Sequence, residues 1–224
     1  MIILFGLYIY NKIFNIDLSN KRIYIFGAKN VSQSEIKKFL IFNIYNTNKI
    51  NLINTKNYIL RAKPELKNIK IYRYYDRIII KVSERVPELY TNKNGKIFGI
   101  DNKNMMFPIH KVQLIGNIPK INYKSLNEKN KLLRFIRIVK VLSNSFYDNV
   151  AEVSFNSLDE IIIQMRNDVI IVWGIYEMNK AIILSKLQKL QTVYKDMTLR
   201  YSKIKYIDMS YYNYGKIIAK QVES

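Results

Sequence analysis

The sequence has no cysteine, a single histidine, seven glycines and four prolines among its 224 residues. Without cysteine the chain cannot form disulfides, cysteine-based zinc sites or a thiol nucleophile, and one histidine leaves little scope for histidine-dependent catalysis. The low glycine and proline counts exclude collagen-like and linker-type compositions. These absences favour a folded chain whose function does not depend on cysteine or histidine chemistry.

Acidic residues are also scarce, because 17 Asp and Glu face 37 Lys and Arg, a net charge of +20. Such a charge attracts phosphates and anionic lipid headgroups. The chain is equally rich in Asn, Ile and Tyr, which share A/T-rich codons with Lys, so compositional drift explains the same excess. Hydrophobic residues make up 49% of the chain, enough to bury one large core or two small ones.

Long hydrophobic runs are few, and the clearest is Met1–Tyr10 (MIILFGLYIY). A membrane-spanning helix needs about 20 apolar residues, so this run has about half the required length. No basic stretch precedes it and no small-residue cleavage site follows it, which argues against a secretory signal. Two interpretations stay open here: the outer part of a membrane anchor that begins upstream of Met1, or a buried strand. Residues 11–21 then form a linker.

Residues 22–84 have the pattern of a small β-α-α-β-β module. Arg22–Phe26 alternates as a strand and ends at Gly27, and Ser32 offers a helix start. A second helix must end near Lys63, because Pro64 disfavours the α conformation before it. Two strands follow, at 68–73 and 77–82, separated by a turn at Tyr74-Tyr75-Asp76. This order predicts a three-stranded sheet with both helices on one face.

Residues 85–224 predict a second, larger α+β domain that is mixed but mainly antiparallel. Asn94-Gly95 is a strong hairpin signal, because both turn positions require φ > 0. Apolar residues at helical spacing predict helices at 129–142 and 177–194. Alternation predicts further strands at 88–91, 96–101, 150–155, 160–166, 169–173, 206–209 and 216–220.

Motifs for catalysis, metals and cofactors are missing. The sequence contains no GxGxxG, P-loop, HExxH or acidic calcium loop, so we predict no catalytic site, no metal site and no cofactor. Segments 71–77 and 194–206 interleave Tyr with Lys and Arg, as single-strand nucleic-acid platforms do. Since Tyr and Lys are abundant throughout the chain, nucleic-acid binding is not the favoured interpretation.

Several motifs in order resemble the bacterial division proteins of the FtsQ/DivIB family. Arg22–Gly27 with Asn30-Val-Ser32 is similar to the opening of that family's POTRA domain. Ile78–Pro87 resembles its last strand and Val-x-Glu-Arg-x-Pro exit, and Gly95–Asp101 and Phe107-Pro108 resemble a following stretch. Asn167–Gly174 with the helix after it, and Ile207–Tyr211 with Gly215–Ala219, resemble its closing segments.

The resemblance implies a single-pass protein of the cell (inner) membrane with extracytoplasmic domains: part of the anchor at 1–10, a POTRA-like domain at 22–84 and an FtsQ-type β domain at 85–224. It implies a non-enzymatic divisome scaffold that binds FtsB- and FtsL-like proteins, with no small-molecule substrate. The motif positions expected to be structural are Gly27, Glu84, Arg85, Pro87 and Asp208. One departure is Ser210, which stands where the family has Arg.

The last predicted strand has only a few residues after it, so we expect it at a sheet edge, where an incoming strand adds to unpaired backbone groups. The partner-binding candidates are Tyr211, which the resemblance matches to an aromatic contact of the family, and, in and just before the last strand, Gly215, Lys216, Ile217, Ile218 and Ala219. Ile217 and Ile218 could equally serve only to pack the sheet. Two other functions stay open: an envelope POTRA protein that chaperones polypeptides, and a basic domain that binds nucleic acid or anionic membranes.

Overall fold

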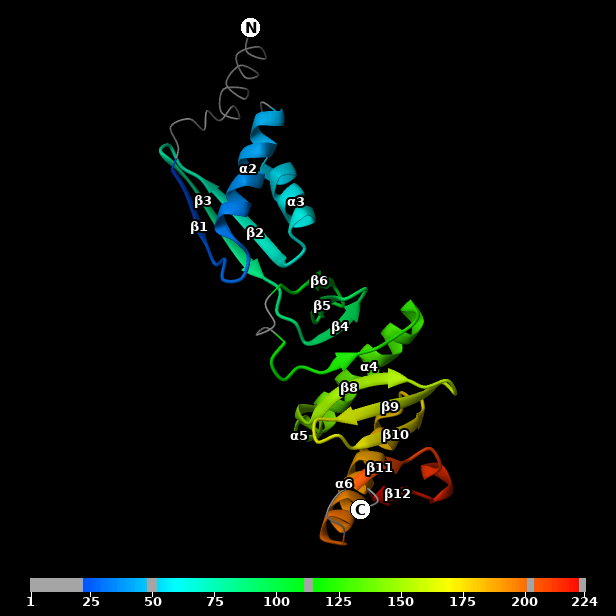
Figure 1. The fold of residues 1–224 in the computed structure, drawn as a ribbon. Helices are drawn as coiled ribbons and strands as arrows, with labels where there is room; N and C mark the ends of the chain where they lie inside the picture. The colour runs from blue at the N-terminus through cyan, green and yellow to red at the C-terminus, as the bar shows by residue number, and fades with distance from the viewer. Residues whose placement is uncertain (1–21, 48–51, 111–114, 201–203, 222–224) are drawn as a thin grey trace. The chain divides into compact units, whose positions relative to one another are not determined.

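The computed structural model describes residues 22–47, 52–110, 115–200 and 204–221 (Figure 1). The chain divides into two compact units, with the boundary between Val86 and Pro87; the first unit also takes in Met106–Lys111. Both units mix helices with sheets, so the predicted α+β class is confirmed. The apolar run Met1–Tyr10 and the linker 11–21 lie outside the described residues.

The first unit contains a three-stranded sheet with strand order β1-β3-β2. β1 and β3 are parallel, with Ile23 beside Ile78, whereas β2 and β3 are antiparallel, with Ile69 beside Val82. The elements, in chain order, are β1 (Arg22–Phe26), α2 (Gln33–Thr47), α3 (Leu52–Ala62), β2 (Leu66–Arg73), β3 (Arg77–Glu84) and the short β6 (Met106–Pro108).

The core of the first unit lies between this sheet and its two helices, which cover one face (Figure 1). Ile36 and Leu40 of α2 and Ile59 of α3 are buried against apolar residues of β2 and β3. Ile78, Ile80 and Val82 alternate with more exposed neighbours along β3, so one side of the strand faces this core. The predicted β-α-α-β-β arrangement is therefore confirmed.

In the second unit the strand order runs β12-β11-β10-β9-β8-β7-β4-β5. Parallel pairs (β10 with β11, β7 with β8, β4 with β7) occur beside antiparallel hairpins. The elements are β4 (Leu89–Lys93), β5 (Lys96–Ile100), β7 (Lys120–Ile121), α4 (Leu126–Leu142), α5 (Asn144–Asp148), β8 (Val150–Phe155), β9 (Glu160–Met165), β10 (Ile170–Ile175), α6 (Lys180–Arg200), β11 (Ile204–Asp208), the 3-10 helix η2 (Tyr212–Tyr214) and β12 (Ile218–Gln221).

The core of the second unit is formed by apolar residues of α4 and α6 and by the sheet. Phe135 of α4 meets Trp173 of β10 edge to face, with 5.3 Å between ring centroids. Ile183, Leu187 and Leu190 of α6 are buried at helical spacing, as the sequence predicted. The Asn94-Gly95 hairpin is also confirmed, with φ of 51° and 75° at its two turn residues.

Side-chain caps explain two helix starts that differ from the prediction. α6 begins at Lys180 rather than 177, because the side-chain oxygen of Asn179 accepts hydrogen bonds from the amides of Ala181 and Ile182. α4 begins three residues before the predicted start, at a Ser125 cap. The short helix α5, which was not predicted, starts at a Ser143 cap and is too brief to show apolar periodicity.

Candidate partner-binding site

The carboxy-terminal ribbon, defined here as residues Met209–Gln221, ends at the edge of the second unit's sheet. β12 pairs antiparallel with β11, and Ile207 lies beside Ala219. Within the described residues, β12 is the last strand in the sheet order and has no strand on its other side. An edge strand presents a row of backbone N–H and C=O groups to which another strand can add. The edge position that the sequence predicted is thus confirmed.

Exposed apolar side chains gather on this ribbon. Tyr211 is 53% exposed, Tyr214 is 79% exposed and Ile218 is 47% exposed. Ile217 and Ala219 are half-buried, because alternate residues of a strand face opposite sides. Of the predicted contact candidates, Tyr211, Gly215, Lys216 and Ile218 are therefore the exposed ones, and Tyr214 is an exposed aromatic residue that the sequence argument did not single out.

Backbone hydrogen bonds within the ribbon shape the turn before β12. The amides of Tyr214 and Lys216 both donate to the carbonyl of Tyr211, at 2.9 and 3.2 Å. Gly215 caps η2 in the left-handed conformation at φ 74°. Because Lys216 is used in this turn, β12 begins at Ile218 rather than at the predicted Lys216.

Asp208 ends β11 and starts the turn, since its carboxylate accepts a hydrogen bond from the amide of Ser210 at 2.8 Å. This contact joins the motif aspartate to the backbone of the turn. The hydroxyl of Ser210 is buried and has no hydrogen-bond partner among the described residues. Ser210 therefore offers no accessible side chain at the position where the family has Arg.

A buried lysine supports the ribbon from α6. The ammonium of Lys186 donates to the carbonyl of Trp173 at 2.6 Å and lies 5.2 Å from the Trp173 ring and 5.6 Å from the Tyr212 ring. Burial lowers the pKa of Lys186, and the more distant carboxylates of Glu177, Asp208 and Glu160 oppose this shift. The contact with Tyr212 links α6 directly to the turn that precedes β12.

Sequence reasoning did not identify Lys186, although a signal was present. Lys186 stands three residues after the buried Ile183 and four before the buried Leu190, so it falls on the apolar stripe of its helix. A lysine at such a position must find a polar partner in the interior. Only the folded chain shows that this partner is the carbonyl of Trp173.

In the first unit, Glu84 holds the loop between β1 and α2. Its carboxylate accepts hydrogen bonds from the amides of Lys29, Asn30 and Val31 at 2.8 to 2.9 Å, and from the Asn30 side chain. Burial by itself would raise the pKa of Glu84, but these donors outweigh burial and lower it. The motif glutamate therefore anchors this loop.

The neighbouring motif residues also lie in close contact with the rest of the fold. Gly27 has φ 87°, and a Cβ there would lie 2.1 Å from the carbonyl oxygen of Val82, so only glycine fits. Arg85 donates from Nε to the carbonyl of Pro64 and from its amide to that of Glu65. Pro87, which is buried, begins the second unit.

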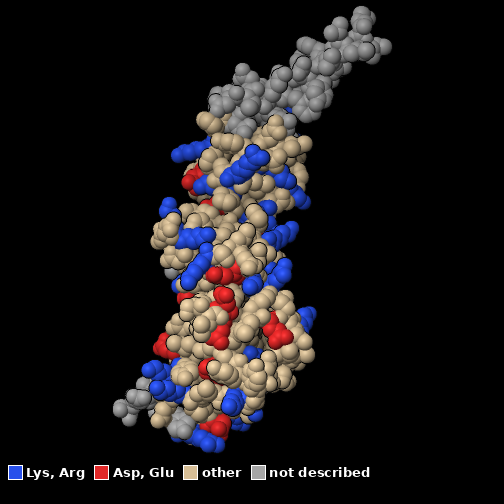
Figure 2. Space-filling model, turned by 90° about the vertical axis from the view of Figure 1, so that its right-hand side faces the viewer, with Lys and Arg blue, Asp and Glu red and all other residues tan. Residues whose placement is uncertain are grey.

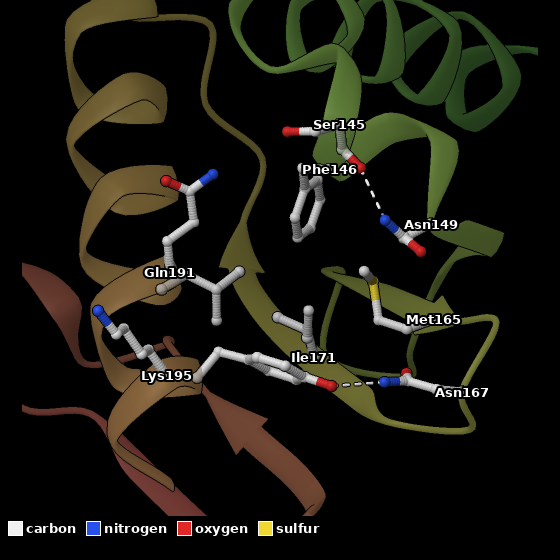
Figure 3. A pocket seen from close by; sticks show the side chains of 10 residues that line it. Ser145, Phe146, Asn149, Met165, Asn167, Ile171, Gln191 and Lys195 are labelled. Carbon is white, nitrogen blue, oxygen red and sulfur yellow. Dashed lines mark hydrogen bonds between the residues drawn. The ribbon is translucent and has the colours of Figure 1, made fainter. Parts of the chain in front are cut away.

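A cavity of about 330 Å³ in the second unit lies between α6, α5 and strands β9 and β10 (Figure 3). Apolar groups such as Phe146, Met165 and Ile171 form its floor. Two hydrogen bonds lie within the lining: Asn167 donates to the hydroxyl of Tyr194, and the side-chain amide of Asn149 donates to the carbonyl of Ser145. Its lining includes neither a carboxylate nor a histidine.

The distribution of charge does not single out a ligand site either. On the face shown in Figure 2, Lys and Arg side chains are spread along the described residues, with Asp and Glu among them. No group of three or more His, Asp or Glu in the described part of the chain is arranged to hold a metal ion. Among the same residues, none of the helices combines the length and the apolar character needed to cross a bilayer.

Comparison with known proteins agrees with the motifs. The family model described as "Cell division protein FtsQ/DivIB, C-terminal" matches residues 87–210, more than half of the chain. The match begins where the second unit begins and ends at Ser210, so it covers the sheet up to β11 but not η2 or β12. No curated protein sequence matches the chain.

Proposed function

Since the chain belongs to the FtsQ/DivIB family of cell division proteins, we propose that it is a non-enzymatic scaffold of the division machinery that captures an extended segment of a partner at β12. The single observation that carries this proposal is the edge position of β12, next to the exposed Tyr211, Tyr214 and Ile218. Backbone groups of the edge supply affinity, and the exposed side chains supply selectivity.

The proposed partners are FtsB- and FtsL-like division proteins. An extended segment adding to β12 must bury apolar side chains against Tyr211 and Tyr214, because exposed aromatic residues are the usual anchors of protein interfaces. The exposed Lys216 lies just before β12, so a segment with an acidic residue beside its apolar ones is complementary.

Members of the family are membrane-associated, and we propose a membrane location for this chain as well. The apolar run Met1–Tyr10 would form part of a single-pass anchor, with residues 22–221 on the extracytoplasmic side. The absence of cysteine is compatible with an oxidising compartment.

The test is capture of a synthetic peptide that covers the extracytoplasmic strand segment of an FtsB-type protein from the same cell. Deleting Ile218–Ser224 from the full chain should abolish capture, measured by isothermal titration calorimetry. Hydrogen exchange of β9 and β3 amides in the same variant reports whether both units stay folded. Undiminished capture by the folded deletion variant would overturn the edge mechanism.

A pair of proline variants examines the backbone contribution more closely. Ala219→Pro and Lys220→Pro remove amide donors from adjacent residues, whose N–H groups point to opposite edges of β12. In one of these two variants the lost N–H points away from β11, toward the incoming strand. That variant should lose capture while keeping the β11–β12 pair. If both variants capture the peptide normally, strand addition is excluded.

The chaperone alternative predicts a different pattern. The outer strands of the first unit's sheet are β1 and β2, so a general polypeptide-binding edge would lie there. In that case an unfolded polypeptide would still bind after deletion of Ile218–Ser224, and substitutions on β1 or β2 would reduce binding.

A further inference from the structure

The sheet of the first unit has a second face, opposite α2 and α3 (Figure 1). Residues that pair across neighbouring strands point to the same side. We use the term outer face for the three rows that this pairing creates: Arg22–Arg77, Tyr24–Ile79–Tyr72 and Phe26–Lys81–Lys70.

The composition of the outer face is aromatic and basic. Tyr24, Phe26 and Tyr72 are exposed aromatic residues. Tyr24 of β1 and Tyr72 of β2 lie on either side of Ile79 in the central strand β3, and Phe26 is the last residue of β1. The four charged members of the three rows are all cations, and none is a carboxylate. Exposed aromatic surface beside a cluster of positive charge is typical of an interaction site.

The turn between β2 and β3 continues this surface. Tyr75 is 99% exposed at its tip, and the Arg77 guanidinium lies 5.2 Å from the ring centroid of Tyr74. Lys81 makes the same kind of contact with Tyr72, at 5.6 Å. The one carboxylate of this turn is Asp76, whose Oδ1 lies 3.9 Å from Nε of Arg77.

This surface is separated from the apolar run Met1–Tyr10 by only a short stretch of sequence, residues 11–21. The amide of Arg22, the first residue of β1, donates to the carbonyl of Asp76 at 3.2 Å, so β1 begins beside the turn. Residues 11–21 connect β1 to Met1–Tyr10 and span at most about 40 Å when fully extended. Whatever surface receives the apolar run therefore lies within reach of the outer face and its turn.

We propose that the outer face and the Tyr74-Tyr75 turn dock on an anionic membrane surface. Tyrosine rings suit the headgroup region, where the ring is shielded and the hydroxyl stays hydrated. Arg22, Arg77 and Lys81 meet anionic headgroups, as juxtamembrane basic clusters do. The inference rests on the proposed membrane location of the chain but not on the β12 edge.

A local fluorescent reporter tests this contact in the full chain. Trp173 is the only tryptophan and is 1% exposed, so a new exposed tryptophan dominates any change in emission. Tyr75→Trp should show blue-shifted emission with vesicles of phosphatidylglycerol and phosphatidylcholine, and quenching by brominated lipid. The apolar run can bring the chain to pure phosphatidylcholine vesicles too, where we expect no shift. Tyr214→Trp, an exposed tyrosine of the second unit, is the control and should not shift on either vesicle.

A matched pair of charge variants tests the electrostatic part. Arg22→Gln with Lys81→Gln should weaken the Tyr75→Trp response to anionic vesicles several-fold, whereas Lys216→Gln with Lys220→Gln, the same loss of charge in the second unit, should not. Equal responses of the two pairs would overturn the proposal. The proposal is also overturned if the indole introduced by Tyr75→Trp stays water-exposed on anionic vesicles, or if the chain itself already shields that indole without lipid. A third contrary result is that an oligonucleotide, rather than the anionic vesicles, binds the outer face to saturation.

Capture of the FtsB-type peptide, measured on the same variants, keeps the two proposals apart. Substitutions on the outer face should leave capture at β12 unchanged, because the two surfaces belong to different units.

Discussion

The ammonium nitrogen of Lys186 lies 2.6 Å from the carbonyl oxygen of Trp173, where strand β10 carries a bulge. Val172 pairs with Ile162 and Gly174 pairs with Ile161, so Trp173 has no partner of its own in β9. A bulge leaves a residue outside the ladder, and a buried carbonyl there needs another donor. Lys186 supplies that donor, and its contact with Tyr212 extends the support to the ribbon.

Lys186→Met should therefore destabilise the second unit by about 1–3 kcal/mol, because the buried Trp173 carbonyl loses its donor while the methionine keeps the packing volume. Lys189→Met, at an exposed position on the same helix, should change stability by less than about 0.5 kcal/mol. Urea denaturation of the two variants checks the difference, and equal stabilities would show that the Lys186 contact contributes nothing.

Gly27→Ala should disrupt the first unit, since the new Cβ would lie 2.1 Å from a backbone oxygen and φ is 87°. We expect a loss above about 3 kcal/mol in the first unit alone. Gly215→Ala is the matched control: φ is 74°, but nothing lies within 4 Å of the new Cβ, so the cost is about 1 kcal/mol. Hydrogen exchange resolved by unit measures both effects, and similar losses would refute the steric argument.

Glu84→Gln should destabilise the first unit by about 2 kcal/mol, because a neutral amide replaces a carboxylate that accepts bonds from three amides. Glu35→Gln, which loses an exposed pair with Lys63, should cost no more than about 1 kcal/mol.

The contribution of Glu84 should also depend on pH. The fold lowers the pKa of Glu84 below its ordinary value of 4.5, so the stabilisation is complete above that value and disappears as the pH falls through the lowered pKa. Acid unfolding of the first unit should show a steeper loss in the parent chain than in Glu84→Gln. Parallel acid-unfolding curves would contradict this assignment.

Tyr214→Ser and Ile218→Lys should each weaken capture of the FtsB-type peptide, because both remove exposed apolar surface beside the edge. A loss of about 2 kcal/mol, roughly 30-fold in Kd, is typical of an anchoring side chain. Tyr75→Ser removes an even more exposed tyrosine from the first unit and should leave Kd unchanged. Calorimetry distinguishes these outcomes, and identical Kd values across all three variants would place the binding surface elsewhere.

The sequence by itself determined the local elements and their order. Asn94-Gly95 specified a hairpin because its two residues accept positive φ, and Pro64 set the end of α3 because it disfavours helix in the residue before it. The spacing of Ile183, Leu187 and Leu190 specified the buried stripe of α6. Short motifs in a fixed order also identified the family, because particular backbone conformations at turns and strand ends require particular residue types at those positions.

Tertiary structure alone decided which distant segments meet. The parallel pairing of β1 with β3, the contact of Glu84 with the loop at Lys29–Val31 and the donor from Lys186 to Trp173 join residues far apart along the chain. Local propensity carries no information on such contacts, because they depend on strand register and on which polar groups burial leaves without a partner. The same reason explains why Tyr214 became visible as a candidate contact only in the folded chain: its exposure is a property of the turn that precedes β12.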